Sequence, residues 1–157
     1  MLMDSHRAKT LILGVGNILL CDEGIGVRVI EYLQQQTLPE SVELVDGGTA
    51  GADMIDILTN RETVIIIDAV RSDKPAGTIM RFGPEDLMPQ QDNPLSLHEL
   101  DIPQTLAMTH LLKCAPKNVI CIGIVPECII PGMNLSETLA DLVPQISQIV
   151  LDSVYRN

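Results

Sequence analysis

The stretch TLILGVGNILLCDEGIGVRVIEYLQQQ, residues 10–36, decides the fold of this chain. Its first part, Thr10-Leu-Ile-Leu-Gly-Val-Gly16, is an apolar run with the length of a buried strand. Residues 23–36 then carry apolar side chains at helical spacing, and Asp22 stands at the position of an N-cap. The glycines between the two segments indicate a tight turn with close backbone packing. The stretch therefore predicts a strand, a turn and a helix, which is the first half of a βαβ unit.

The rest of the chain continues in the same alternating order. Strands are expected at residues 42–46, 63–68, 78–82 and 118–125, and helices at 51–60, 99–113 and 135–154. The alternating segment 78–82 is typical of an edge strand and is compatible with an antiparallel one. Ser136 or Asn134 is expected near the N-cap of the last helix, which Pro144 is predicted to kink. This order predicts an α/β fold with a mostly parallel sheet of about five strands and right-handed crossovers.

The length and composition indicate one domain, residues 1–157, with residues 1–9 as a frayed N-terminus. Hydrophobic residues make up 46% of the chain and aromatic residues only 2%, so the core must be aliphatic. The formal net charge of −11, without a basic stripe, argues against nucleic-acid binding and against an anionic membrane surface. No segment reaches the ~20 apolar residues of a membrane span, and the N-terminus lacks an apolar signal region. The sequence therefore predicts a cytoplasmic protein.

The four cysteines, Cys21, Cys114, Cys121 and Cys128, contain no CxxC pair. We expect reduced thiols that are buried or half-buried, with a zinc site as the alternative. Residues 83–97 contain three prolines and little periodicity, which predicts a long surface loop. Loops of that length in compact domains are often functional, so this loop is a candidate for substrate contact.

Three acids and one histidine stand where an α/β protein binds ligands. Glu23 opens the first helix, Asp46 and Asp68 end the second and third apolar runs, and His98 follows the long loop. The carboxyl ends of parallel strands meet at one edge of the sheet, where carboxylates repel one another unless a cation or shared protons neutralise them. Glu23, Asp68 and His98 suit a divalent metal such as zinc, manganese, iron or nickel. Each residue alone also fits an ordinary role, as a helix-dipole acid, a turn residue or a surface histidine.

The pair Gly14-Val-Gly16 after a strand also suggests a dinucleotide site, with Asp46 as the acid that binds the ribose. Leu19 occupies the place of the third glycine, and the helix starts too late. Asp22 and Glu23 would in addition present negative charge to a pyrophosphate at the helix N-terminus. These features disfavour the dinucleotide-binding class.

Five motifs, in the same order along the chain, resemble those of the nickel–iron hydrogenase maturation endopeptidases. They are Leu13-Gly-Val-Gly-Asn-Ile-Leu-Leu-Cys-Asp-Glu-Gly-Ile-Gly-Val-Arg28, Asp46-Gly-Gly-Thr-Ala-Gly51, Ile67-Asp68-Ala69, Ser96-Leu-His98 and Gly123-Ile-Val-Pro-Glu127. The resemblance spans residues 10–154. It implies a twisted sheet with helices on both faces.

The resemblance also implies a function and a set of site residues. The family removes a short C-terminal extension from the precursor of the hydrogenase large subunit, after nickel has been inserted. The family's metal-binding residues correspond to Glu23, Asp68 and His98, and Asp46 is a further catalytic candidate beside Asp68. The nickel is expected to be the substrate's own, although another divalent metal can occupy the site in a purified sample.

Two mechanisms and two other functions stay open at this point. Either Glu23, Asp68 and His98 bind the precursor's nickel and so license cleavage, or an acid activates water directly. The same ligand set also fits a nickel-sensing assembly chaperone that binds the precursor without cleaving it. A peptidyl-tRNA hydrolase shares the Gly-x-Gly-Asn turn, but Asp22, Glu23 and the charge of −11 argue against tRNA binding.

Overall fold

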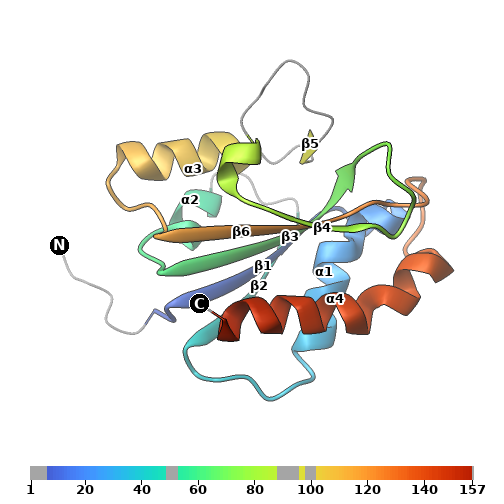
Figure 1. The fold of residues 1–157 in the computed structure, drawn as a ribbon, viewed down its shortest axis with the longest axis horizontal. Helices are drawn as coiled ribbons and strands as arrows, with labels where there is room; N and C mark the ends of the chain where they lie inside the picture. Colours follow the sequence, from blue (N-terminus) through green and yellow to red (C-terminus); the bar gives the residue numbers. More distant parts are fainter. Residues whose placement is uncertain (1–6, 49–52, 88–95, 98–101, 157) are drawn as a thin grey trace.

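The computed structural model describes residues 7–48, 53–87, 96–97 and 102–156 (Figure 1). In chain order the elements are β1 (Thr10–Val15), η1 (Cys21–Gly24), α1 (Ile25–Leu33), β2 (Val42–Gly48), α2 (Asp53–Leu58), β3 (Thr63–Arg71), β4 (Ile79–Phe82), η2 (Pro84–Leu87), β5 (Ser96–Leu97), α3 (Ile102–Leu111), β6 (Asn118–Ile124) and α4 (Glu137–Tyr155), where η marks a 3₁₀ helix. The main sheet has the order β2-β1-β3-β6-β4. All its pairs are parallel except that of β4 with β6. The predicted α/β fold with about five strands is confirmed, and so is the antiparallel edge strand.

Helices cover both faces of the sheet, as the family resemblance implied. Figure 1 shows α1 and α4 on one face, and α2 and α3 on the other. Because side chains point alternately to the two faces of the sheet along each strand, they form two separate aliphatic clusters, one on each face. The cluster under α1 and α4 includes Ile12, Ile65 and Ile122, and the cluster under α2 and α3 includes Leu13, Ile66 and Cys121. Burial of these side chains holds the helices to the sheet, at about 1.5–3 kcal/mol for each large aliphatic group.

Glycine lets α1 lie unusually close to the strands beneath it. A Cβ atom on Gly26 would lie 2.2 Å from the carbonyl oxygen of Ile67 and 2.5 Å from that of Val15. Gly14, in β1, faces the same helix, and a Cβ there would lie 2.3 Å from the carbonyl oxygen of Gly26. Any side chain at these two positions would push α1 away from the sheet. The contact thus fixes the distance between β3 and the start of α1. Glu23 lies two residues before that start.

The first helix begins later than predicted. Residues 21–24 form η1, and α1 runs only from Ile25 to Leu33. Gly24 occupies the N-cap position and no side chain caps the helix, so the prediction of Asp22 as the N-cap is wrong. The reason is tertiary, because the Asp22 carboxylate binds a distant segment instead.

The third strand is longer than its apolar run. β3 continues past Asp68 to Arg71, because Asp68 and Ala69 still pair with β6 and the next two residues pair with β5. Asp68 is therefore inside a strand and does not end it. β2 likewise runs on past Asp46 to Gly48. Backbone pairing with other strands, which the sequence alone does not reveal, extends both strands.

The remaining differences are small. Residues 7–9, predicted to fray, are bound to the body of the protein: Arg7 donates to the carbonyl of Thr59, and the carbonyl of Lys9 accepts from Glu62. Residues 1–6 lie outside the described part of the chain. The predicted loop 83–97 contains η2 and the short strand β5.

The last helix follows the prediction at its start. Ser136 caps α4, and the assigned helix continues through Pro144. Among the helices that the structure describes, none has the length and apolar character needed to cross a membrane.

Candidate active site

The strand order reverses between β1 and β3, and we term the edge of the sheet at this reversal the crevice. The chain leaves β1 for β2 on one side and then returns to form β3 on the other side. In doubly wound sheets, ligands bind at such a reversal, outside the carboxyl ends of the strands. Glu23 comes soon after β1, and Asp68 lies near the carboxyl end of β3. The fold therefore brings two of the predicted site residues to the two sides of this crevice.

Glu23 is held in place by the backbone around it. It is 5% exposed, and η1, which carries it, packs against β3. A Cβ atom on Gly16 would lie 1.9 Å from the carbonyl oxygen of Glu23, and Gly16 has a φ of +131°. Only glycine permits both that backbone conformation and that close approach. The tight turn predicted from the glycines thus serves to seat Glu23 against the end of β1.

Asp68 lies on the neighbouring strand and is 2% exposed. The two-residue period of a strand gives it the same face as Ile66, toward α2 and α3. Glu23 and Asp68 are two buried acids on elements that pack together, and carboxylate oxygens are ligands that divalent metals accept. The site is chemically suited to a cationic group of the substrate or to activation of water.

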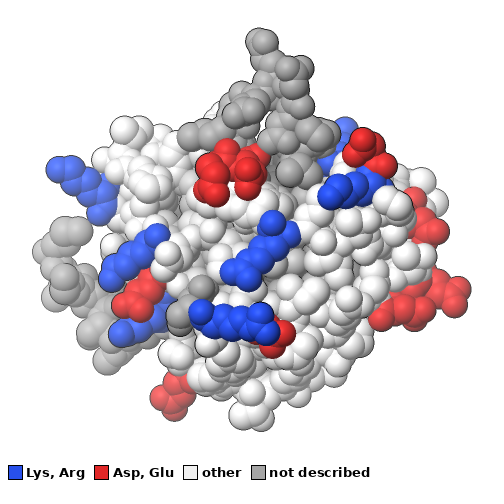
Figure 2. All heavy atoms as spheres, in the orientation of Figure 1, with Lys and Arg blue, Asp and Glu red and all other residues white. Residues whose placement is uncertain are grey.

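The thiol of Cys121 is affected by the negative charges in this region. Burial, followed by the negative charges of Asp68, Glu85 and Asp86, raises the pKa of its thiol to about 12. The thiol is therefore neutral near pH 7 and is not a nucleophile. Glu85 and Asp86 belong to η2, where acidic side chains gather on the molecular surface (Figure 2). The sequence analysis did not select these two acids, because no apolar run leads into them.

His98 lies outside the described residues. The structure does describe the residue before it. Leu97 of β5 pairs with Val70, which lies two positions beyond Asp68 on β3. Within the described part of the chain, which includes all four cysteines, no three potential metal ligands come together. The described part supplies Glu23 and Asp68 on two elements that pack together, and the three-residue set with His98 stays a prediction.

Asp46 stands apart from Asp68. It is exposed, accepts a hydrogen bond from the backbone N–H of Gly48 at 2.9 Å, and pairs in register with Gly14. That register turns it toward α1, on the opposite face from Asp68, and two strand spacings separate the backbones by about 10 Å. The structure does not bring these two predicted catalytic acids together.

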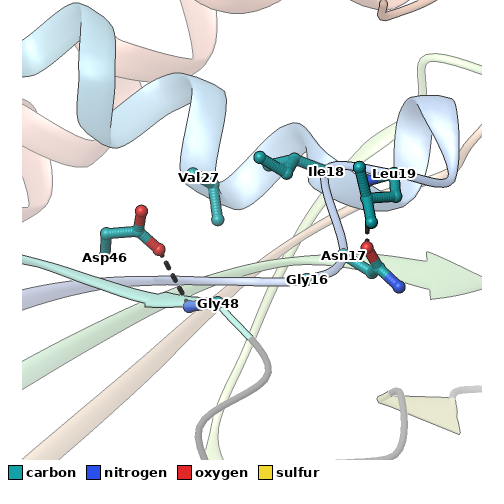
Figure 3. Close-up of a pocket in the computed structure, with 7 residues that line it drawn as sticks. All are labelled: Gly16, Asn17, Ile18, Leu19, Val27, Asp46 and Gly48. Carbon is teal, nitrogen blue, oxygen red and sulfur yellow. Dashed lines mark hydrogen bonds between the residues drawn. The ribbon is translucent and has the colours of Figure 1, made fainter. Parts of the chain in front are cut away.

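A cavity of about 250 Å³ lies beside Asp46. It is lined by Gly16, Asn17, Ile18, Leu19, Val27, Asp46 and Gly48 (Figure 3). Figure 3 shows Asp46 and Leu19 at opposite ends of this group, with Val27 between them. Because Gly16 also seats Glu23, the cavity adjoins the crevice and has room for a segment of a bound chain next to the predicted site acids.

Asp22 has a structural role that the sequence analysis missed. It is fully buried, and its carboxylate accepts hydrogen bonds from the backbone N–H groups of Glu127 (2.9 Å), Cys128 (3.0 Å) and Ser136 (2.7 Å). The hydroxyl of Ser136 donates a fourth bond, at 2.8 Å. These bonds join η1, at the residue before Glu23, to the segment between β6 and α4. No local pattern reveals them, since the partners lie more than a hundred positions away.

The fold and this edge define a doubly wound α/β protein with an acidic site at the reversal of its strand order. Comparison with known proteins identifies the family. The family model for hydrogenase maturation proteases, HycI, matches residues 27–153. The chain belongs to this family of peptidases, which confirms the resemblance drawn from the five motifs.

Particular relatives support the assignment along nearly the whole chain. The hydrogenase 2 maturation protease of Escherichia coli is 39% identical over 145 residues, which are 90% of this chain and 88% of that protein. The hydrogenase expression/formation protein HupD of Thiocapsa roseopersicina is 33% identical over 149 residues, 93% of this chain, which spans only 64% of that longer relative. The solved structure of the hydrogenase maturating endopeptidase HybD from E. coli superimposes with a TM-score of 0.85 at 37% identity, covering 94% of this chain and 93% of that chain.

Proposed function

We propose that this protein removes a short C-terminal extension from the precursor of a nickel–iron hydrogenase large subunit, after nickel insertion, and that the precursor's own nickel is the recognition signal. The observation that carries the proposal is the placement of two buried acids, Glu23 and Asp68, on the two sides of the crevice between β1 and β3. Membership in the protease family supplies the reaction class.

The chemistry of the two acids supports recognition of a cation. Their carboxylates lose hydration on burial, and a divalent metal presented by the substrate offsets that loss. Leu97, which precedes His98 in the sequence, is paired to β3 close to Asp68. A set formed from Glu23, Asp68 and His98 would bind nickel in the loaded precursor and would have no ligand in the unloaded precursor.

Hydrolysis needs a group that activates water near the scissile bond. Asp68 is the stronger candidate, because it is buried near the carboxyl end of β3, the strand against which η1 packs. Asp46 borders the adjoining cavity and is exposed, which suits contact with the substrate segment that enters it. General-base catalysis by such a group contributes typically 10²–10⁴-fold to a rate.

The test is a cleavage assay on a purified large-subunit precursor, with and without nickel, using the wild type, His98→Ala and Asp68→Asn. We expect loss of the C-terminal peptide only with nickel, and a fall of about 100-fold or more for either variant. A matched control is Asp73→Asn, an exposed acid in the loop before β4, which should cleave like the wild type.

Two results would contradict the proposal. Cleavage of nickel-free precursor at the normal rate would remove nickel as the signal. Binding of the loaded precursor without cleavage, by wild-type protein, would favour an assembly chaperone in place of a protease.

A further inference from the structure

A group of exposed apolar side chains stands beside the crevice. Of the eight large hydrophobic side chains that are exposed in the described residues, four lie on two adjoining loops, and this concentration marks one surface. They are Leu19 (57% exposed), Ile129 (37%), Ile130 (58%) and Met133 (59%), which together we term the apolar platform.

Backbone hydrogen bonds hold the two loops of the apolar platform side by side. The N–H of Gly132 donates to the carbonyl of Leu19 at 2.9 Å, and the N–H of Cys21 donates to the carbonyl of Gly132 at 2.8 Å. Leu20 and Gly132 form a parallel bridge. The guanidinium of Arg28 donates to the carbonyl of Met133 at 2.7 Å. The surface is preformed, so a ligand that docks on it loses little free energy to ordering the loops.

The apolar platform is continuous with the site. Leu19 belongs both to the platform and to the wall of the cavity that Asp46 borders (Figure 3). The same loop leads through Cys21 into η1, which carries Glu23. The segment that bears Ile129 and Ile130 is fastened to η1 by the buried carboxylate of Asp22. A chain that reaches the crevice from this side must pass over the platform.

The size of the surface argues against a second copy of this chain as its occupant. Four aliphatic side chains exposed to this extent offer roughly 400 Å² of apolar area, about half of what each partner of a stable protein interface contributes. That area suits a short extended segment of a larger substrate, whose remaining contacts are made elsewhere.

We infer that the apolar platform binds a short segment with large aliphatic side chains in the hydrogenase precursor, next to its cleavage site, and so sets substrate affinity. This inference rests on the proposed function, because it takes the precursor as the occupant. The platform contacts substrate away from the reacting atoms, so it contributes to binding of the ground state and the transition state alike.

The experiment compares two double variants, each of which replaces two exposed large apolar side chains. Ile130→Gln/Met133→Gln alters the platform. Leu111→Gln/Leu112→Gln is the matched control, at the end of α3 that leads into the start of β6 and therefore at the opposite edge of the sheet. Binding of nickel-loaded precursor is measured by biolayer interferometry, and KM and kcat are measured by the cleavage assay.

We expect the platform variant to raise Kd and KM about tenfold or more, with kcat within about twofold of the wild type, whereas the control changes neither. Equal values for the two double variants, alongside normal wild-type cleavage, would overturn the inference and leave the proposed function intact. Wild-type binding without cleavage would reject the proposed function, and Kd would still decide the role of the platform. No wild-type binding would reject both.

Sedimentation of the wild type and the platform variant provides a last check. We expect a monomer for each at the concentrations of the binding assay. A wild-type dimer that the platform substitutions dissociate would assign the surface to a second copy of this chain and would overturn the inference.

Discussion

At the scale of single residues, hydrogen-bond partners define the role of Asp22. Asp22, Glu23 and Asp68 are all buried near the crevice, but the partners of Asp22 are backbone N–H groups and one hydroxyl. A carboxylate with four donors is a structural acceptor and is not available to a substrate. Glu23 and Asp68, which lie on the two sides of the crevice, stay the predicted site acids.

Replacement of Asp22 tests its structural role. In Asp22→Ala, three backbone N–H groups and one hydroxyl lose their acceptor, and each buried donor without a partner costs about 1–3 kcal/mol. Since water reaches some of these groups after the change, we expect a loss of about 3–5 kcal/mol in the free energy of unfolding. The measurement is a urea titration at pH 7. The exposed Asp73→Ala is the control and should change stability by less than about 0.5 kcal/mol; equal midpoints for the two variants would contradict the assigned role.

At the scale of secondary-structure elements, backbone contacts determine where the site lies. The strand–turn–helix unit of residues 10–33 is compact because Gly14 and Gly26 let α1 touch β1 and β3. Pairing in register places Asp46, Gly14 and Ile67 on one line across the sheet. One position further along β3, Asp68 points to the opposite face. A shift of one residue in β3 would exchange the buried acid for an isoleucine.

Gly26→Ala tests the contact between α1 and the sheet. Alanine is the better helix former by about 1 kcal/mol, but its Cβ would lie 2.2 Å from the carbonyl oxygen of Ile67. Overpacking of this kind typically costs about 1–3 kcal/mol, so after the gain in helix propensity we expect a net loss of about 1 kcal/mol, and up to about 2 kcal/mol. Displacement of α1 also moves η1 and Glu23, and cleavage should fall with stability. Thermal unfolding and the cleavage assay measure both effects.

Gln145→Ala, at an exposed position of α4, controls for the change in helix propensity. A Gly26→Ala variant that is as stable and as active as this control would show that α1 has room to move from the sheet without consequence.

At the scale of the whole molecule, charge and burial couple stability to pH. The chain carries a formal net charge of −11, yet the two clusters of its hydrophobic core are almost entirely aliphatic. Cys121 is one titratable group between β3 and β4 whose ionisation the fold opposes. Its folded-state pKa of about 12, against 9.0 for an ordinary thiol, makes it a probe of global unfolding at alkaline pH.

The sign of this coupling follows from proton release. Above pH 9 the unfolded chain loses the Cys121 proton while the folded protein keeps it, so rising pH favours unfolding until about pH 12. Stability is unaffected by this group below pH 9 and then falls by up to about 1.4 kcal/mol per pH unit. We expect the wild type to lose about 1 kcal/mol more than Cys121→Ala between pH 8 and pH 10, as measured by urea unfolding. Equal losses would place the thiol in contact with water in the folded state.

The sequence by itself determined the class of fold and the family. Alternating apolar strands and amphipathic helices leave few ways to bury both faces of a sheet, so βαβ order predicts a parallel sheet from local pattern alone. The acids Glu23 and Asp68 were selected as candidates for the same reason, because they follow or end apolar runs and strand ends converge. The five motifs predicted the protease family, which the comparisons confirm.

Only the tertiary structure determined which partners the polar residues bind and which face of the sheet they occupy. Asp22 looked like a helix cap, and it became the acceptor for a segment more than a hundred residues away. Asp46 and Asp68 each end an apolar run in the sequence, and the register of three strands placed them on opposite faces. Leu19 and Ile130 became one surface only through hydrogen bonds between two distant loops. The physical reason is that local propensity acts over a few residues, whereas burial, register and hydrogen-bond partners are set by the packing of the whole chain.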